Sequence, residues 1–137
     1  MRRQLVGRGI ACLLVLSVLS AADGAGSRTT EVTVERARAL LAEKSGRAGL
    51  VLLDVRTPEE YAQGHLKGAM NLNVASPEFV DRLGRLDRAR TYLVYCRTGN
   101  RSTQAVRMME RLGFKSILHM GEGIVGWQRS RLPLVRS

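Results

Sequence analysis

Apolar positions in this 137-residue chain fall into short continuous runs separated by segments with helical spacing. The runs Leu50–Leu53 and Thr91–Tyr95 contain almost no charged residues, which is typical of strands buried on both faces of a sheet. Three shorter candidates are less regular: Glu31–Thr33, Ala69–Leu72 and Ser116–His119. Together these segments predict about five strands.

Four segments between the strands have helical patterns. One extends from Thr33, the expected N-cap, to about Lys44, with Gly46 beyond its end. A short second helix is opened by a capping box, in which Thr57 is followed by Pro58 and Glu60. A third starts at Ser76-Pro77, and a fourth covers Ser102–Leu112. The apolar side of the third helix is expected to hold Phe79, Val80, Leu83 and Leu86, and that of the fourth Ala105, Met108, Met109 and Leu112.

This alternation of strands and helices predicts an α/β fold: a small, mainly parallel sheet of about five strands, flanked by helices on both faces. No internal repeat or second domain is evident, so residues 31–137 form one expected domain. Ligands of such sheets bind beyond the carboxyl ends of the strands. Cys96 follows one strand and Asp54-Val55-Arg56 ends another, so both are expected at the same crevice.

The first 22 residues have the three parts of a secretory signal peptide. Arg2, Arg3 and Arg8 make a basic start, Ile10–Leu19 is apolar, and Ser20-Ala21-Ala22 supplies small residues at a cleavage site. We expect cleavage after Ala22, a flexible tether over residues 23–30, and a periplasmic or secreted protein. The apolar run is about half of the roughly 20 residues that span a membrane, so an uncleaved anchor is the weaker alternative.

Composition narrows the possible partners. The formal net charge is +10, and loss of three leader arginines leaves +7. Basic residues are scattered among acidic ones and aromatic residues are few, which argues against nucleic acid and favours small anionic substrates. After cleavage Cys96 is the one remaining cysteine, which excludes an intrachain disulfide. With only His65 and His119 beside it, no metal-ligand spacing is evident, and no cofactor is expected.

The strongest chemical signal is the loop after Thr91–Tyr95. A strand delivers Cys96 to a short loop that opens a helix, where inward backbone N–H groups and the helix N-terminus favour a thiolate or an anion. Arg97 and Arg101 add positive charge. We therefore expect Cys96 to have a lowered pKa and to act as a nucleophile, although many free cysteines are simply small buried apolar residues. The expected substrate-binding residues are Arg97, Thr98, Gly99, Asn100, Arg101 and Ser102.

From Thr33 to Leu134 the chain resembles the rhodanese family of sulfurtransferases, specifically its single-domain exported members. The shared pieces occur in the family's order. They are Asp54-Val55-Arg56, Glu59-Glu60-Tyr61, Gly64-His65, Gly68-Ala69 with Asn71, the Cys96 loop, and Gly123-Ile124-Val125-Gly126-Trp127 with Leu132-Pro133. Two positions depart from the family pattern: Glu122 precedes Gly123 where a glycine pair is common, and Arg131 stands where glycine is usual.

The resemblance implies that Cys96 takes a sulfur atom from thiosulfate, releases sulfite and passes the sulfur from a persulfide to cyanide or a thiol. Arg97 would attract the sulfonate, and Arg101 would brace the loop. Gly99 would allow a turn that a side chain would obstruct. Asp54 and Arg56 are more often a structural ion pair or loop anchor, and they are assigned a supporting role. Thiosulfate is expected to be a better donor than mercaptopyruvate.

Two other functions use the same cysteine. Phosphatase and arsenate-reductase relatives carry five residues between cysteine and arginine, whereas four residues separate Cys96 from Arg101 here. This shorter loop fits a single sulfur atom better. The other alternative is a non-catalytic binding or sensing domain, in which Cys96 carries persulfide or is oxidised as a signal. The sequence leaves the sulfur acceptor and the oligomeric state open.

Overall fold

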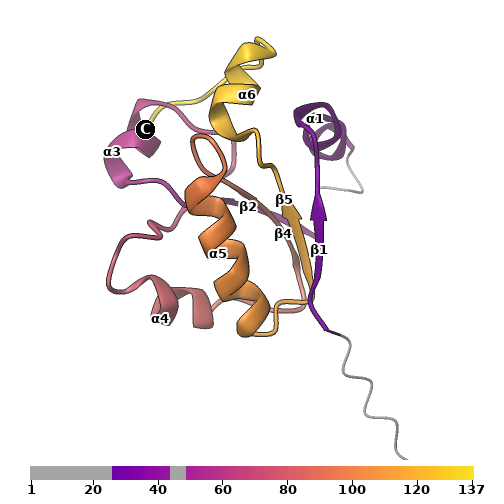
Figure 1. The fold of residues 1–137 in the computed structure, drawn as a ribbon. Coiled ribbons are helices and arrows are strands. Elements are labelled where there is room, and N and C mark those ends of the chain that lie inside the picture. Colours follow the sequence, from indigo (N-terminus) through magenta and orange to yellow (C-terminus); the bar gives the residue numbers. More distant parts are fainter. Residues whose placement is uncertain (1–25, 44–48) are drawn as a thin grey trace, which may run out of the picture.

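The computed structural model describes residues 26–43 and 49–137. In this part of the chain a parallel five-stranded sheet, ordered β1-β5-β4-β2-β3, lies between helices (Figure 1). The elements in chain order are β1 (Arg28–Glu31), α1 (Val34–Ala42), β2 (Leu50–Asp54), α3 (Pro58–Gln63), β3 (Met70–Asn71), α4 (Phe79–Gly84), β4 (Thr91–Tyr95), α5 (Asn100–Arg111), β5 (Ser116–His119) and α6 (Gly123–Arg129). The predicted α/β class is confirmed.

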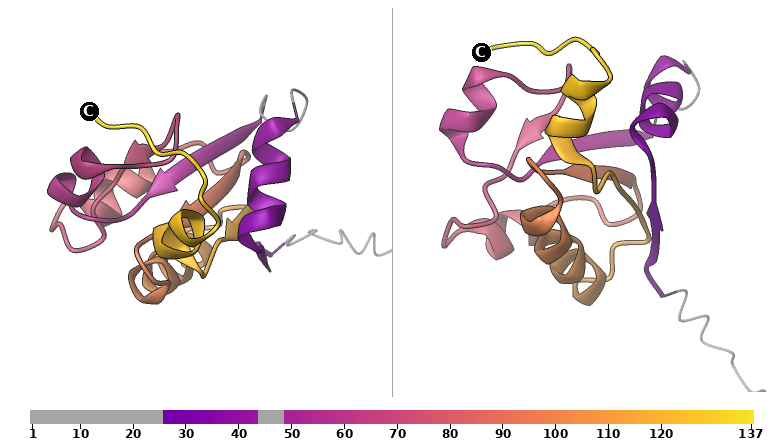
Figure 2. Two further views of the ribbon diagram at one scale, coloured as in Figure 1. Left: turned by 90° about the horizontal axis from the view of Figure 1, so that it is seen from above. Right: turned by 45° about the horizontal axis from the view of Figure 1, so that its top comes forward.

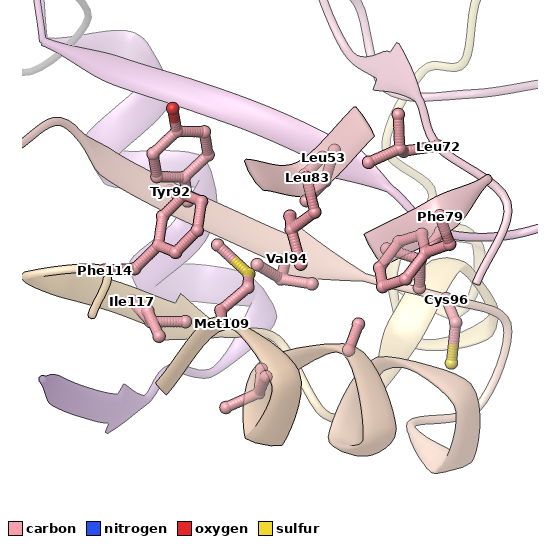
Figure 3. Close-up of a cluster of buried hydrophobic side chains, with 13 residues drawn as sticks. Leu53, Leu72, Phe79, Leu83, Tyr92, Val94, Cys96, Met109, Phe114 and Ile117 are labelled. Atoms are coloured by element: carbon pink, nitrogen blue, oxygen red, sulfur yellow. The ribbon is translucent and has the colours of Figure 1, made fainter. Parts of the chain in front are cut away.

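Alternating side chains of the central strand β4 point to opposite faces of the sheet. Tyr92 and Val94 join a core with α4 and α5, whereas Leu93 and Tyr95 join a second core with α1 and α6. Figure 3 shows the first core, in which Phe114 meets Tyr92 edge to face with ring centroids 5.1 Å apart. The strand is therefore covered on both sides, as its apolar sequence predicts.

The starts of two helices agree with the capping signals in the sequence. Thr33 caps α1 by accepting a hydrogen bond from the Arg36 backbone N–H at 3.1 Å. The capping box of α3 forms as predicted, with both the Thr57 and the Glu60 side chains engaged. The expected leader, residues 1–22, and the expected α1 end at Gly46 lie outside the described residues. Of the helices described, none has the length and apolar character needed to cross a membrane.

Three expectations about the fold were wrong, and one helix was missed. The strand expected over Glu31–Thr33 lies instead over Arg28–Glu31. The tether was expected to include residues 28–30, but these residues belong to β1, whose backbone pairs with β5. The helix expected from Ser76 begins at Phe79 and is short. Phe79 and Leu83 face the core as expected. Val80 was also expected on the apolar side, but it is 51% exposed, because successive residues of a helix are rotated by about 100°. The segment that becomes α6 was not recognised as a helix.

The C-terminal segment packs beside α3 rather than extending away from the domain. The backbone of Val135 exchanges two hydrogen bonds of 2.9 Å with His65. Trp127 donates its indole N–H to the Pro133 carbonyl at 3.0 Å, which holds the turn that leaves α6. Figure 2 shows the tail crossing from α6 towards α3. The tail thereby reaches the same end of the sheet as the Cys96 loop.

Candidate functional site

Cys96 follows β4 directly and lies at one end of the apolar core. Its residue is 1% exposed, and in Figure 3 its sulfur points away from Tyr92 and Phe114, at the opposite end of the cluster. The Cys96 carbonyl accepts a hydrogen bond from the backbone N–H of Ile124 at 2.9 Å, so the first turn of α6 is bonded to the backbone of Cys96. The strand end therefore fixes the sulfur in a defined, sheltered position.

The loop after Cys96 surrounds the sulfur with donors. The Gly99 backbone N–H donates to Cys96 Sγ at 3.0 Å, and the Ser102 hydroxyl lies 3.3 Å from the same sulfur. Burial raises the pKa of Cys96, but hydrogen bonds from the Ser102 side chain and from the backbone N–H groups of Ser102, Gly99 and Thr98 outweigh it. The net pKa lies below the ordinary thiol value, as the sequence predicts, so the loop favours the thiolate.

Two glycines allow the loop to pack closely against the start of α6. Gly99 has φ +101°, and a Cβ there would lie 2.5 Å from the carbonyl oxygen of Gly121. Gly123 has φ +62°, and its Cβ would lie 2.2 Å from the carbonyl oxygen of Arg97. Side chains at either position would push the two backbones apart. Gly99 was predicted to allow a turn that a side chain would obstruct. Both its positive φ and the nearby Gly121 backbone explain why a side chain would not fit there.

The charged residues of the loop occupy different environments. Arg97 is exposed, whereas Arg101 donates to both carboxylate oxygens of Glu60, at 2.6 and 2.8 Å. This pair connects α5 to α3 and supports the predicted bracing role of Arg101. Thr98 and Asn100 are exposed, so at Thr98 the backbone N–H, and not the side chain, is what lowers the pKa of Cys96.

Asp54 and Arg56 form a buried pair at the end of β2. The Asp54 carboxylate accepts from Arg56 Nε at 3.0 Å and from Nη2 at 2.6 Å, and Arg56 Nη2 also donates to the Gly64 carbonyl at 2.7 Å. Asp54 is fully buried. These contacts give the pair the geometry of a loop anchor, holding the β2 end against the turn after α3.

A cleft of about 570 Å³ opens beside the loop. Arg56, Arg97 and Arg136 bring positive charge to it, and α6 forms one wall through Ile124 and Val125. Its complete lining is Arg56, Glu60, Gln63, Gly64, Arg97, Ile124, Val125, Gln128, Leu134 and Arg136. The cleft thus suits a small anion. Of the residues expected at one crevice, Arg56 lines it, whereas Cys96 and Asp54 are absent from the lining and Cys96 is represented by its neighbour Arg97.

The structure places a further group behind Cys96 that the sequence analysis did not assign. The Ser102 hydroxyl lies 2.7 Å from His119 Nε2, and His119 Nδ1 lies 2.6 Å from Glu31 Oε1. His119 ends β5, so the strand-end rule that pointed to Cys96 could have pointed to it too. Glu31 could not be found in this way, because its proximity depends on β1 pairing with β5 across 88 residues. Among residues 26–43 and 49–137, no group of three His, Cys, Asp or Glu side chains could hold a metal ion.

Comparisons with known proteins show which family this chain resembles. The model of the rhodanese-like domain matches residues 34–130. The chain is 35% identical over 86 residues to a sulfurtransferase of Allochromatium vinosum, covering 63% of this chain and 78% of that one. It is 31% identical over 96 residues to thiosulfate sulfurtransferase 16, chloroplastic, of Arabidopsis thaliana, covering 63% and 80%.

Another relative and a solved structure extend the comparison. An HTH-type transcriptional regulator of Mycobacterium tuberculosis is 35% identical over 118 residues, which cover 85% of this chain and 49% of the regulator. The chain thus spans about half the length of that relative. The crystal structure of a rhodanese-related protein from Thermoplasma volcanium superposes with a TM-score of 0.67 at 26% identity, covering 78% of this chain and 98% of that one.

Proposed function

Because this chain belongs to the rhodanese-like domain family, we propose that it is a thiosulfate sulfurtransferase that carries the transferred sulfur on Cys96. The coarser assignment, a sulfurtransferase-type domain, is supported by relatives of that name. The observation that carries the proposal is the ring of donors around Cys96 Sγ, formed by Gly99 N–H, the Ser102 hydroxyl and neighbouring backbone groups. Such donors stabilise a thiolate before the reaction and a persulfide anion after it.

The proposed reaction has two displacement steps. The Cys96 thiolate attacks the outer sulfur of thiosulfate, a new S–S bond forms, and sulfite leaves with the electron pair of the old S–S bond. A thiolate or cyanide then attacks the outer sulfur of the persulfide, and the Cys96 thiolate leaves. No net oxidation occurs, and the enzyme alternates between two covalent forms, which corresponds to ping-pong kinetics.

The positive cleft supports a sulfonate-bearing donor. Arg97 adjoins Cys96 in sequence and lines the cleft with Arg136, so both guanidinium groups are available to an anion there. Guanidinium groups bind oxyanions through charge-assisted hydrogen bonds. The Arabidopsis relative is named a thiosulfate sulfurtransferase, which is in line with this choice. Mercaptopyruvate is proposed as the poorer donor.

Intact mass measured on the purified protein tests the proposal. After incubation with thiosulfate, the wild-type mass is expected to rise by one sulfur atom and to return on addition of cyanide. Cys96→Ser, with a similar volume and no thiol, is the matched control and is expected to gain nothing. A folded, reduced wild-type protein that gains no sulfur from thiosulfate would contradict the proposal.

A sensing role is the second candidate, and the match to half of a transcriptional regulator favours it over the phosphatase alternative. A sensor would also gain sulfur on Cys96, but it would pass the sulfur on slowly or to one partner only. Steady-state turnover with thiosulfate and a small thiol separates the two. Rapid turnover supports the enzyme, and loading without turnover supports the sensor.

The protein is further proposed to act outside the cytoplasm, after cleavage of the leader at Ala22. The basic, apolar and small-residue parts of residues 1–22 support this proposal. Expression of the full chain with a C-terminal tag, fractionation and N-terminal sequencing test it. A new N-terminus at Asp23 in the periplasmic fraction is the expected result, and an uncleaved chain in the cytoplasm would contradict it.

A further inference from the structure

Four side chains form a continuous line from the sulfur of Cys96 to the edge of the sheet. Cys96 Sγ lies 3.3 Å from Ser102 Oγ, which lies 2.7 Å from His119 Nε2. His119 Nδ1 lies 2.6 Å from Glu31 Oε1. Ser102 is fully buried and His119 is 5% exposed, whereas the Glu31 side chain is 70% exposed. The line therefore begins in the protein interior and ends at solvent.

Each member comes from a different part of the fold, so the line depends on the tertiary structure. Cys96 directly follows β4, Ser102 is in the first turn of α5, His119 ends β5, and Glu31 ends β1. The absence of a side chain at Gly121 leaves room for the Glu31 and His119 side chains, because a Cβ there would lie 3.2 Å from Glu31 Oε2 and 3.7 Å from the His119 ring. The adjacent strands β1 and β5 end together in register at Glu31 and His119.

The hydroxyl of Ser102 has one proton, which limits how these contacts can be used. When the Glu31 carboxylate accepts from Nδ1–H of a neutral His119 ring, Nε2 is an acceptor. The Ser102 hydroxyl then donates to Nε2, and its oxygen can accept from the Cys96 thiol. When Cys96 is a thiolate, the hydroxyl donates to the sulfur, and a protonated Nε2 donates to Ser102. The Gly99 carbonyl, 3.0 Å from Ser102 Oγ, is the competing acceptor.

We propose that His119 is a positioning residue that accepts the Cys96 thiol proton through Ser102, while Glu31 orients its ring. The S–H bond breaks, that proton passes to Ser102 Oγ, and the hydroxyl proton passes to His119 Nε2. A neutral thiol and imidazole thereby become a thiolate and an imidazolium, with no proton lost to solvent. The role in turnover rests on the proposed sulfur transfer, but the ionisation of Cys96 can be measured without it.

Other charged groups also lie near Cys96. Arg101 attracts it but is engaged with Glu60, and the buried Asp54 is paired with Arg56. Arg97 lies on the loop and faces the cleft. Besides Cys96 itself, His119 is the titratable side chain that the described contacts connect to the Ser102 hydroxyl, and this distinguishes its contribution from the general positive field.

The test is the rate of Cys96 alkylation by iodoacetamide as a function of pH, which needs no sulfur donor. His119→Gln keeps an amide donor for Ser102 but cannot take up a proton. We expect the rate at pH 7 to fall about tenfold and the midpoint of the profile to move to higher pH. His65→Gln is the matched control, because the contacts described for its ring are with Tyr61, whose ring it stacks on and whose carbonyl lies 2.8 Å from Nδ1. It is expected to retain the wild-type profile.

Two further variants connect the effect to the line of contacts. If His119 acts through Ser102, adding His119→Gln to Ser102→Ala is expected to cause no further loss. Glu31→Gln changes an exposed group and is expected to lower the rate about threefold in a protein that folds normally, even if His119→Gln does not fold. A wild-type pH profile in folded His119→Gln or in folded Glu31→Gln would overturn the proposal. So would fully additive losses of alkylation rate when His119→Gln and Ser102→Ala are combined. Failure of thiosulfate loading with these alkylation results intact would instead contradict the sulfurtransferase assignment.

Discussion

Arg101 and Glu60 form a two-point ion pair across 41 residues of sequence, with Nη1 to Oε2 at 2.6 Å and Nη2 to Oε1 at 2.8 Å. Glu60 also accepts from the backbone N–H of Thr57, so one carboxylate both caps α3 and holds the first turn of α5. The Cys96 loop lies directly before that turn. Its conformation therefore depends on a helix that contributes no residue to the sulfur's immediate surroundings.

Replacement of Glu60 by glutamine tests this support. The hydrogen bond from Arg101 lowers the pKa of Glu60 to about 2. A carboxylate with a lowered pKa in the folded state stabilises the fold above its unfolded pKa, and loses this effect as pH falls through the folded value. We expect Glu60→Gln to cost about 1 kcal/mol at pH 7, since the pair is partly exposed, and the deficit to shrink between about pH 4.5 and pH 2. Urea unfolding across this pH range measures it.

The exposed pair of Asp81 and Arg85 supplies the control for that experiment. Asp81 lies on α4 and Arg85 follows its last residue; their charged atoms are 2.7 Å apart, and their side chains are 68% and 76% exposed. Asp81→Asn is expected to change the free energy of unfolding by less than about 0.5 kcal/mol. Equal losses from Asp81→Asn and Glu60→Gln would indicate that the Glu60 pair has no special role.

Removal of the Arg97 side chain is expected to weaken thiosulfate binding. Arg97→Ala takes one guanidinium from the cleft but leaves the backbone around Cys96 unchanged. We expect the KM for thiosulfate to rise about tenfold with a smaller change in kcat. Arg107→Ala, which removes the same charge from an exposed position on α5, is the control. An unchanged KM in Arg97→Ala would count against sulfonate binding at this residue.

The close approach at Gly99 predicts a large cost for a single methyl group. Gly99 and Gly113 both have positive φ, at +101° and +82°, but an added Cβ meets the Gly121 backbone only at Gly99. Gly113→Ala is expected to cost about 1 kcal/mol from its dihedral angle alone. Gly99→Ala is expected to cost about 2 kcal/mol more, because two backbones must separate. Chemical denaturation of both variants compares them, and equal costs would exclude the packing explanation.

The buried pair of Asp54 and Arg56 is expected to affect stability more than binding. Asp54→Asn leaves Arg56 without its carboxylate in a site where Asp54 is fully buried. We expect a loss of about 3 kcal/mol in the free energy of unfolding, with an unchanged KM for thiosulfate in the folded fraction. Thermal unfolding and steady-state kinetics separate these effects. A raised KM at undiminished stability would instead place the pair in substrate binding.

Local signals in the sequence were sufficient to predict most of the fold. The continuous apolar runs predicted β2 and β4, and the capping residues Thr33 and Thr57 marked two helix starts correctly. Helix α6 was missed because Gly123 and Gly126 are poor helix formers in isolation. In the structure the Gly123 and Gly126 N–H groups are engaged with the carbonyls of Met120 and Glu122. Packing against the Cys96 loop thus overrides the local preference.

The site was predictable only where its parts are adjacent in sequence. Residues 96–102 bring the sulfur and its donors together within one loop, so the pattern could be recognised directly. Glu122 illustrates the opposite case: at this departure from the family's glycine pair, its side chain accepts the Val34 N–H at 3.0 Å. It thereby supports the start of α1, a helix 88 residues away in sequence. Contacts of this kind depend on strand order, which no local pattern contains.

The donors that surround Cys96 include several backbone N–H groups, as well as the one hydroxyl of Ser102. Amino-acid replacement cannot delete a backbone N–H except by introducing proline, so this part of the site is insulated from most mutations. The arginines at the cleft have no such protection, because their contribution lies wholly in their side chains. Substrate preference in this protein can therefore diverge by changes at the cleft while the nucleophile keeps its reactivity.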